Sequence, residues 1–196
     1  MSAQVSLVDY GAGNLRSLRA AFERLGARVT ITSDPARVAS SQRVVLPGVG
    51  AAGPAMAALR ARGLERVLAG VPRLLGVCLG MQLLFERSAE GDVACLGLLP
   101  GRVERIDWAA RLPHMGWNDV TPVAPAALAA ALPAVCYFAH SYAVAPADPG
   151  LVVAETEVDG RSVPTVIAAD GVAGVQFHPE KSGPAGRRLL EAWLAA

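Results

Sequence analysis

The chain has 196 residues, of which 53% are hydrophobic and 18% are charged, and its formal net charge is +1. A chain of this length and apolar content can bury a sizeable core and is too apolar for disorder, so we expect one domain spanning residues 1–196. The charges are scattered without long single-sign blocks, which argues against a nucleic-acid or anionic-membrane partner.

The first residues and the cysteines indicate the compartment. The segment MSAQVSLVDYG has no basic region followed by an apolar stretch, and no run reaches the roughly 18 apolar residues of a membrane span. Cys78, Cys95 and Cys136 are an odd number without C-x-x-C pairing, which favours reduced thiols over disulfides or a zinc site. We therefore expect a soluble, cytoplasmic protein without a metal.

In the first half of the chain, short apolar runs alternate with helical patterns. We predict strands at 4–11, 28–32, 43–48 and 74–77, and helices at 14–26, 55–70 and 81–86. Strands that alternate with helices indicate an α/β sheet, largely parallel and covered by helices on both faces.

The second half consists mostly of short strands between turns. We predict strands within 97–106, 118–123, 135–144, 151–158, 162–170 and 171–178. This spacing indicates hairpins added to the same sheet or beside it. We expect a surface helix and loop at 122–134 and a last helix at 183–196.

The segment GVCLG, residues 76–80, has the form G-x-C-x-G between a predicted strand and a predicted helix. Small flanking residues permit the sharp turn of a nucleophile elbow, which exposes the central side chain. A thiol there lies at a helix amino terminus, where the dipole favours thiolate and the next backbone N–H can donate to an oxyanion. Cys78 is therefore a candidate nucleophile. A buried structural cysteine is the alternative, because Cys is among the most buried residue types.

A catalytic thiol needs a base, and the chain has three histidines, His114, His140 and His178. Alternate residues of a strand share a face, so Gln176, His178 and Glu180 can point the same way. Glu180 can then accept from the ring nitrogen that faces away from the thiol, which fixes the tautomer. A lone histidine at a strand end is more often structural. The acid two residues on and the cysteine elbow favour His178 as the base.

Two glycine-rich loops follow predicted strands. LPGVG, residues 46–50, is suited to supply a second oxyanion donor, because glycines let the backbone approach a ligand; a tight strand-to-helix turn is the alternative. DYGAGNL, residues 9–15, lacks the third glycine of a dinucleotide fingerprint and the Gly-Lys-Ser/Thr ending of a Walker A loop. Nucleotide binding is disfavoured, and we expect no cofactor.

The strings GVCLGMQLLFE and GVQFHPEKSG resemble the class I (triad) glutamine amidotransferases. The further strings DYGAGNLRSL, LPGVG, LPHMGWN and YFAHSY resemble one family among them, the glutaminase subunits of imidazole glycerol phosphate synthase from histidine biosynthesis. The resemblance runs from Val8 to the terminal helix. It implies a flavodoxin-like α/β fold, and an enzyme whose cysteine attacks the side-chain amide of L-glutamine, releases ammonia and leaves a glutamyl thioester that water cleaves.

Carried over residue by residue, the resemblance implies that Cys78 is the nucleophile, His178 the base and later the acid, and Glu180 the group that orients it. The backbone N–H groups of Val49 and Leu79 would form the oxyanion hole. The implied glutamine-binding residues are Gly50, Gln82, Glu90, His140, Ser141 and Tyr142.

Each of these binding residues also has an ordinary structural explanation. Gln82 is compatible with an exposed helix position, and Glu90, the implied partner of the substrate's α-ammonium group, is compatible with a solvated loop charge. Ser141 and Tyr142 are compatible with ordinary strand positions. A site for glutamine must satisfy both an ammonium and a carboxylate, which polar side chains and backbone groups of strands and loops can do.

The resemblance also implies a partner, a (β/α)₈-barrel cyclase on a separate polypeptide, in a heterodimer that passes ammonia directly between its subunits. The candidate interface residues are Asn14, Trp117 and Lys181. Trp is enriched in interface hot spots, although a half-buried core Trp is equally compatible. Lys181 is the only lysine in the chain. We expect the isolated chain to be nearly silent, with an oxyanion hole completed only when partner and ligand bind.

Three rival functions share part of this pattern. An amidotransferase subunit of another synthase would have the same triad, and a cysteine hydrolase of similar fold would also have an elbow cysteine. A non-catalytic regulatory subunit is the third, and the intact Cys78, His178 and Glu180 argue against it.

Overall fold

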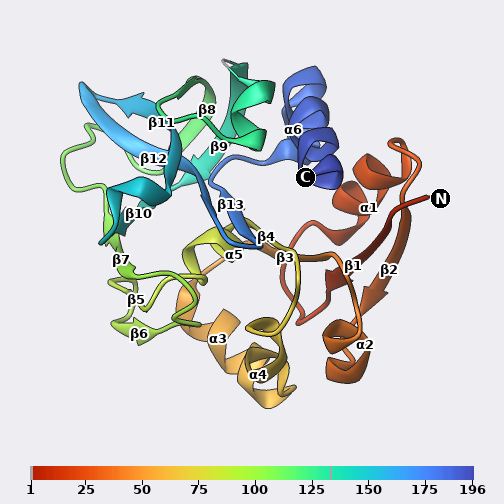
Figure 1. The fold of residues 1–196 in the computed structure, drawn as a ribbon. Coiled ribbons are helices and arrows are strands. Elements are labelled where there is room, and N and C mark those ends of the chain that lie inside the picture. The colour runs from red at the N-terminus through yellow and green to blue at the C-terminus, as the bar shows by residue number, and fades with distance from the viewer. Residues whose placement is uncertain (1, 133) are drawn as a thin grey trace.

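A computed structural model describes residues 2–132 and 134–196. Within these residues the chain forms a nine-stranded mixed sheet and a four-stranded sheet beside it (Figure 1). The larger sheet has the spatial order β2 (Arg28–Thr32), β1 (Gln4–Val8), β3 (Val44–Gly48), β4 (Leu74–Cys78), β13 (Val172–Val175), β12 (Arg161–Ala169), β11 (Val152–Val158), β8 (His114–Pro122) and β9 (Ala134–His140). The smaller sheet has the order β10 (Tyr142–Pro146), β7 (Gly101–Arg105), β5 (Arg87–Ser88) and β6 (Val93–Ala94).

The larger sheet changes character in the middle. From β2 to β13 neighbouring strands run parallel, and this half has the 2-1-3-4-5 order of flavodoxin-like folds. From β13 to β9 neighbouring strands run antiparallel. The predicted α/β class is confirmed, and the predicted hairpins occupy both expected places, because some extend the main sheet and others form the second one.

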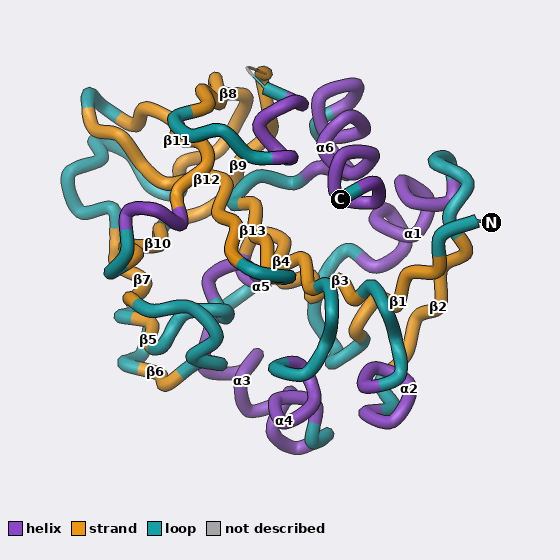
Figure 2. Tube along the Cα trace, viewed as in Figure 1, coloured by secondary structure: helices purple, strands orange, loops and turns teal. Residues whose placement is uncertain are grey.

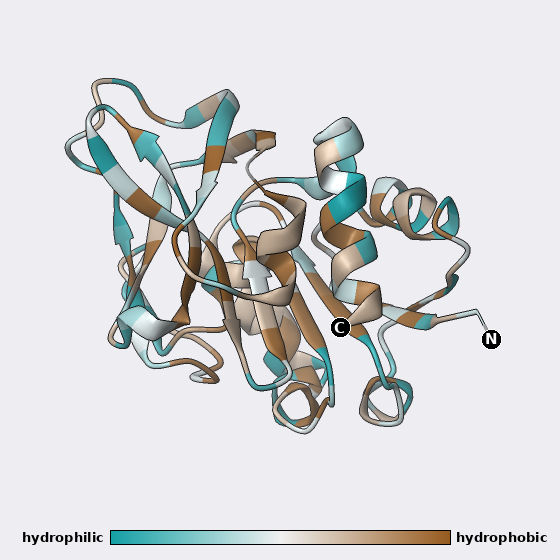
Figure 3. Ribbon diagram, turned by 45° about the horizontal axis from the view of Figure 1, so that its top comes forward, coloured by the Kyte–Doolittle hydropathy of each residue, from teal (hydrophilic) through white to brown (hydrophobic). Residues whose placement is uncertain are grey.

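Helices cover both faces of the parallel half (Figure 2). On one face lie α1 (Leu15–Glu23) and α6 (Gly183–Ala195), whose Phe22 and Trp193 rings meet edge to face with centroids 5.8 Å apart. The opposite face is covered by α2 (Pro35–Ala39), α3 (Ala52–Ala61) and α4 (Leu64–Leu68). The central strands β3 and β4 are therefore buried at every position, and Figure 3 shows the centre of the sheet coloured mostly as hydrophobic, whereas the edge strand β2 is partly exposed. In the described residues no helix has the length and apolar character needed to cross a bilayer.

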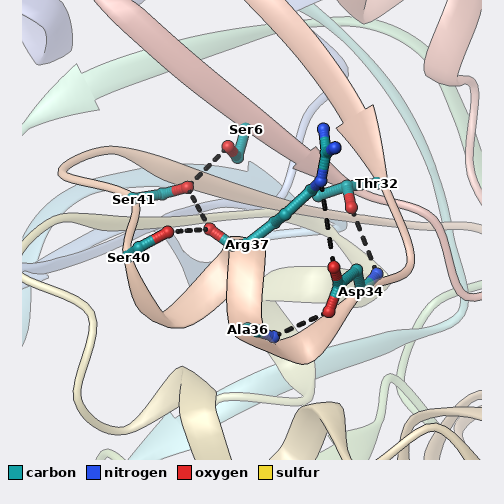
Figure 4. Close-up of polar contacts among 7 residues, drawn as sticks. All are labelled: Ser6, Thr32, Asp34, Ala36, Arg37, Ser40 and Ser41. Atoms are coloured by element: carbon teal, nitrogen blue, oxygen red, sulfur yellow. Dashed lines mark hydrogen bonds and ion pairs between the residues drawn. The ribbon is translucent and has the colours of Figure 1, made fainter.

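On the α3–α4 side, two predicted helices differ from the structure and a third helix is present that was not predicted. The helix predicted at 55–70 is two helices, because Gly63 between them adopts a left-handed backbone with φ 67°. Helix α2 was not predicted, although Asp34 and Pro35 are an ordinary start signal. The Asp34 carboxylate accepts from the Ala36 N–H at 2.9 Å (Figure 4). The helix predicted at 81–86 is α5 (Leu79–Gln82), which is earlier and shorter.

A neighbouring segment explains why α5 stops after one turn. The backbone N–H groups of Leu96, Gly97 and Leu98 donate to carbonyls of residues 83–85, at 2.8–2.9 Å. Those carbonyls are therefore used by residues 96–98 and not by a continuing helix.

The described residues of the segment 122–134 are mostly exposed or half-buried, as predicted. It contains a 3₁₀ turn, η1 (Ala127–Ala131), and Leu128 and Ala131 in it are buried in the same core as α6. The predicted surface helix is thus a short 3₁₀ turn, with Leu128 and Ala131 packed inward and Ala127 and Ala130 exposed. Residue 133 of this segment lies outside the described residues.

The turn from β4 into α5 is packed against β3 without spare room. A Cβ added to Gly80 would lie 1.9 Å from the Leu46 carbonyl oxygen, and one added to Gly76 would lie 2.7 Å from the Gly80 backbone. Both distances are far below normal contact, so no other residue fits either position without moving the backbone.

We predict that Gly80→Ala lowers the free energy of unfolding by about 3 kcal/mol or more, because overpacking against a fixed backbone cannot be relieved by a rotamer change. Urea denaturation measures the loss. The matched control is Gly53→Ala in α3, where the new Cβ meets only Val93 at 3.6 Å. Equal stability of the two variants would contradict the packing argument.

Candidate active site

The carboxyl ends of β3, β4 and β13 meet beside a cleft of about 350 Å³. Gly48 at the end of β3 pairs with Cys78 at the end of β4. Val175, the last residue of β13, pairs with Val77, so the chain leaves the sheet next to Cys78 as it enters Gln176–His178. Parallel strands place chemistry at this edge because loops from several strands converge there.

The cleft brings together most of the residues singled out from the sequence. Cys78 and His178 line it, together with both predicted oxyanion residues, all the predicted glutamine-binding residues and Lys181. Glu180 lies behind His178, and Trp117 lies outside the cleft lining on β8.

Cys78 has the backbone of a strained elbow. Its φ of 55° and ψ of −113° depart from the allowed regions of non-glycine residues, and its side chain is 6% exposed. The predicted strand-to-helix turn is therefore present. The helix that follows has four residues, and a single turn carries little macrodipole, so the dipole contributes less to a thiolate than the sequence indicated.

His178 and Glu180 form a buried pair. The His178 Nδ1 lies 3.1 Å from Glu180 Oε1, and the two side chains are 6% and 1% exposed. A carboxylate only accepts, so Nδ1 carries the proton and Nε2 is left for Cys78. Burial lowers the pKa of His178, but the hydrogen bonds and charges of Cys78 and Glu180 raise it more, to about 9. The imidazolium form of His178 is thus favoured at neutral pH.

Asn14 does not behave as a simple surface residue. Its Nδ2 lies 3.5 Å from Glu180 Oε1, and the side chain is half-buried. The GAGN loop therefore contacts the acid of the pair, which the sequence did not indicate, because the two residues are 166 positions apart.

The Tyr142 carbonyl orders the opposite wall of the cleft. It accepts from Gln82 Nε2 and from His140 Nδ1, both at 2.9 Å. Because a carbonyl cannot donate, His140 carries its proton on Nδ1. Its Nε2 then accepts from His114 Nδ1 at 3.1 Å, and His114 Nε2 accepts from Asn118 Nδ2 at 3.2 Å. In each hydrogen bond of the series from Asn118 to the Tyr142 carbonyl the donor and the acceptor are therefore fixed. The imidazoles of His114 and His140 are both neutral.

The surroundings favour these neutral forms. The pKa of His140 is lowered to about 4, mainly by burial. The hydrogen bond to the Tyr142 carbonyl raises this pKa, whereas the charges of His114 and His178 lower it further. Burial also lowers the pKa of His114. The pKa values of His114 and His140 are therefore lowered, whereas the pKa of His178 is raised.

Glu90 and Tyr10 fix the remaining walls. A Glu90 carboxylate oxygen accepts from the Ala52 N–H at 2.9 Å, which holds it at the start of α3 while it lines the cleft. The buried Tyr10 hydroxyl donates to the Pro47 carbonyl at 2.8 Å and so holds the LPGVG loop. Burial, with the charge of Cys78 nearby, raises the pKa of Tyr10, which keeps the hydroxyl a donor.

Two of the predicted interface residues share one aromatic neighbour. Trp117 is 60% exposed and meets the Tyr137 ring edge to face, with centroids 6.0 Å apart. Lys181 Nζ lies 5.4 Å from the Tyr137 ring centroid. Met115, 62% exposed on the same strand as Trp117, adds to this apolar surface. Large exposed apolar side chains of this kind mark contact surfaces.

Comparisons with known proteins place this geometry in context. The family model "Glutamine amidotransferase class-I" matches residues 6–196. The chain is similar to the imidazole glycerol phosphate synthase subunit HisH of Xanthomonas axonopodis pv. citri, with 49% identity over 97% of this chain and 96% of the relative. The HisH subunit of Xylella fastidiosa is 47% identical with the same coverage.

The fold is shared with more distant structures. A solved glutamine amidotransferase has a TM-score of 0.77 at 20% identity and covers 97% of this chain and 99% of its own. The structure of PurLQS from Thermotoga maritima has a TM-score of 0.79 at 19% identity and covers 100% of this chain and 99% of its own.

We predict three separate histidine titrations in the imidazole NMR spectrum. His178 titrates near pH 9, whereas His114 and His140 titrate below the ordinary value of about 6.5, His140 near 4. In Glu180→Gln the pKa of His178 falls by about one unit or more, because a neutral amide stabilises the imidazolium less. The pKa values of His114 and His140 stay unchanged in that variant and serve as internal controls. Titration of all three near 6.5 would contradict the assignment.

Proposed function

The chain belongs to the class-I glutamine amidotransferase family, and from that premise we propose that it is the glutaminase subunit of an imidazole glycerol phosphate synthase in histidine biosynthesis. The names of the similar subunits support the synthase. The observation that carries the chemistry is that Cys78 and His178 line one cleft, with Glu180 3.1 Å behind His178. We assign residues 1–196 to this single glutaminase domain.

The first half of the reaction makes a thioester. The Cys78 sulfur adds to the carboxamide carbon of glutamine, and His178 holds the proton from the thiol. When the tetrahedral intermediate collapses, the C–N bond breaks, and His178 gives its proton to the leaving nitrogen, so ammonia departs. Glu180 holds the imidazole in the correct tautomer and stabilises it while it is charged.

The second half regenerates the enzyme. Water attacks the glutamyl thioester, and His178 takes a proton from that water as a general base. The C–S bond then breaks, glutamate leaves, and the proton on His178 returns to the Cys78 sulfur.

Backbone donors stabilise the oxyanion in both halves. Leu79 is the first residue of α5, so its N–H has no partner within that helix. Val49 lines the same cleft in the turn after β3, and its N–H is the second donor we assign. The side chain of Val49 is 46% exposed, so this turn is accessible to a partner or a ligand that completes the hole.

Polar groups around the cleft bind the two ends of the substrate amino acid. We assign Glu90 to the α-ammonium group, because it is the carboxylate among the residues that line the cleft. Gly50, Gln82 and the segment 140–142 form the remaining walls. The Tyr142 carbonyl is fully used by Gln82 and His140, which keeps this segment rigid when substrate binds.

The partner we propose is a (β/α)₈-barrel cyclase on a separate polypeptide. It would combine the ammonia with a ribulosyl-formimino nucleotide to give imidazole glycerol phosphate and an aminoimidazole carboxamide nucleotide. Trp117 and Lys181 are the interface residues we assign; Asn14, beside Glu180, would contact both the partner and the triad. We place the heterodimer in the cytoplasm and assign no cofactor to the glutaminase step.

We predict that Cys78→Ala abolishes glutamine-dependent synthesis by the complex and leaves synthesis from added ammonium salts intact, because only the glutaminase step needs the thiol. The measurement is product formation with each nitrogen source, with the barrel cyclase of this pathway. Cys95→Ala, whose thiol does not line the cleft, is the control. Loss of both activities in a folded Cys78→Ala complex would give Cys78 a structural role. Glutaminase activity without transfer to this cyclase would indicate another synthase.

We predict that Trp117→Ala weakens the complex at least tenfold, since truncating an aromatic anchor costs about 1.4 kcal/mol or more. Calorimetric titration with the cyclase subunit measures the affinity. Val123→Ala is the control, because Val123 is 53% exposed just beyond the other end of β8. An unchanged affinity of Trp117→Ala would exclude this residue from the interface.

A further inference from the structure

Gln176 is a buried polar residue that the proposed reaction leaves without a role. It follows the last residue of β13, its side chain is 0% exposed, and its backbone N–H donates to the Thr165 carbonyl at 2.8 Å. The amide therefore lies in a fixed position between the nucleophile elbow and the wall of the cleft. A buried amide retains its hydrogen bonds because leaving them unmade is costly.

The orientation of the Gln176 amide follows from the Tyr142 carbonyl. That carbonyl can only accept, so the Gln82 atom 2.9 Å from it is the NH₂ group. The same Gln82 NH₂ lies 3.0 Å from one Gln176 side-chain atom, which must be the oxygen. The Gln176 NH₂ group is then the one that faces the Cys78 sulfur, at 3.8 Å. Turning either amide over would place donor against donor or acceptor against acceptor.

We propose that Gln176 holds the Cys78 sulfur and stabilises its ionised form by donating an N–H bond to it, while its oxygen fixes the Gln82 amide in the glutamine pocket. This role rests on the proposed function, because it gives Cys78 a reacting sulfur. Gln176 thus joins the nucleophile to the wall that holds the substrate.

Few other groups around Cys78 stabilise a negative charge on its sulfur. Helix α5 has a single turn and contributes little dipole, and the sulfur is nearly buried, so water solvates it poorly. His178 is the cationic partner, and Tyr10 is the other titratable group whose charge state is coupled to Cys78. Glu180 acts through His178. A neutral amide donor stabilises the thiolate further, and the amide does not itself lose a proton.

The test is the pH dependence of Cys78 alkylation by iodoacetamide, followed by mass spectrometry of the peptide that contains Cys78. The full chain is used, alone and with the cyclase. Because the method reads one peptide, the other thiols do not interfere; burial also raises the pKa values of Cys95 and Cys136. In Gln176→Met, which has the same length without a donor, we expect the midpoint to rise by about one pH unit. In Gln176→Glu we expect a larger rise, because a carboxylate replaces the donor.

A matched control separates this role from packing. Thr165→Val changes a side chain that is also 0% exposed, next to Gln176, and keeps the backbone carbonyl that accepts from it. We expect this variant to keep the wild-type midpoint. In the complex, Gln176→Met should lower kcat for glutamine about tenfold, whereas ammonium-dependent synthesis stays unchanged.

The wild-type chain gives a reading that needs no Gln176 variant. The side-chain NH₂ signals of Gln176 in the ¹⁵N NMR spectrum should titrate with the midpoint of alkylation and stop titrating in Cys78→Ala. An unchanged alkylation midpoint in folded Gln176→Met, or amide signals that do not respond to Cys78, would overturn the proposal. These readouts need no glutamine, so they stand or fall separately from the glutaminase activity.

Discussion

The contact between the β4–α5 turn and strand β3 is the constraint on which the rest of the site depends. Gly80 lies against the Leu46 carbonyl so closely that no side chain fits without moving the backbone, and two residues earlier Cys78 has a positive φ of 55°. Once the elbow is seated, the pairing of Gly48 with Cys78 places the turn after β3 beside the thiol. The parallel pairing of β13 with β4 then brings His178 to the same edge.

The two halves of the larger sheet contribute different parts of the cleft. The parallel half places the proposed nucleophile and its base together, because its loops converge at one edge. The antiparallel hairpins supply the wall that faces them, through the segment 140–142, where the chain passes from β9 into β10. The same hairpins present Trp117 and Met115 to solvent. The proposed partner surface and one wall of the proposed glutamine pocket are therefore parts of one structural unit.

Charge is arranged in opposite ways on the two sides of the cleft. On one side, the hydrogen bonds and charges of Cys78 and Glu180 raise the pKa of His178 more than burial lowers it. On the other side burial keeps His140 neutral, and the direction of each hydrogen bond from Asn118 to the Tyr142 carbonyl depends on that neutral form. A protonated His140 would place two donors against each other. His178 can thus carry a second ring proton, whereas His140 and His114 stay neutral with one ring proton each on Nδ1.

The sequence by itself determined the features that depend on local pattern. Alternating strands and helices gave the α/β class, and G-x-C-x-G followed by a helix gave the elbow at Cys78. The H-P-E spacing predicted the His178–Glu180 pair, although the expected strand ends at Val175 and the 3₁₀ turn η3 (Pro179–Lys181) brings Glu180 to His178. Only the tertiary structure decided the rest. Asn14 meets Glu180 across 166 positions, Gln176 meets Cys78 across 98, and α5 ends after one turn because residues 96–98 take its next carbonyls. Contacts between segments so far apart depend on packing, which no local pattern contains.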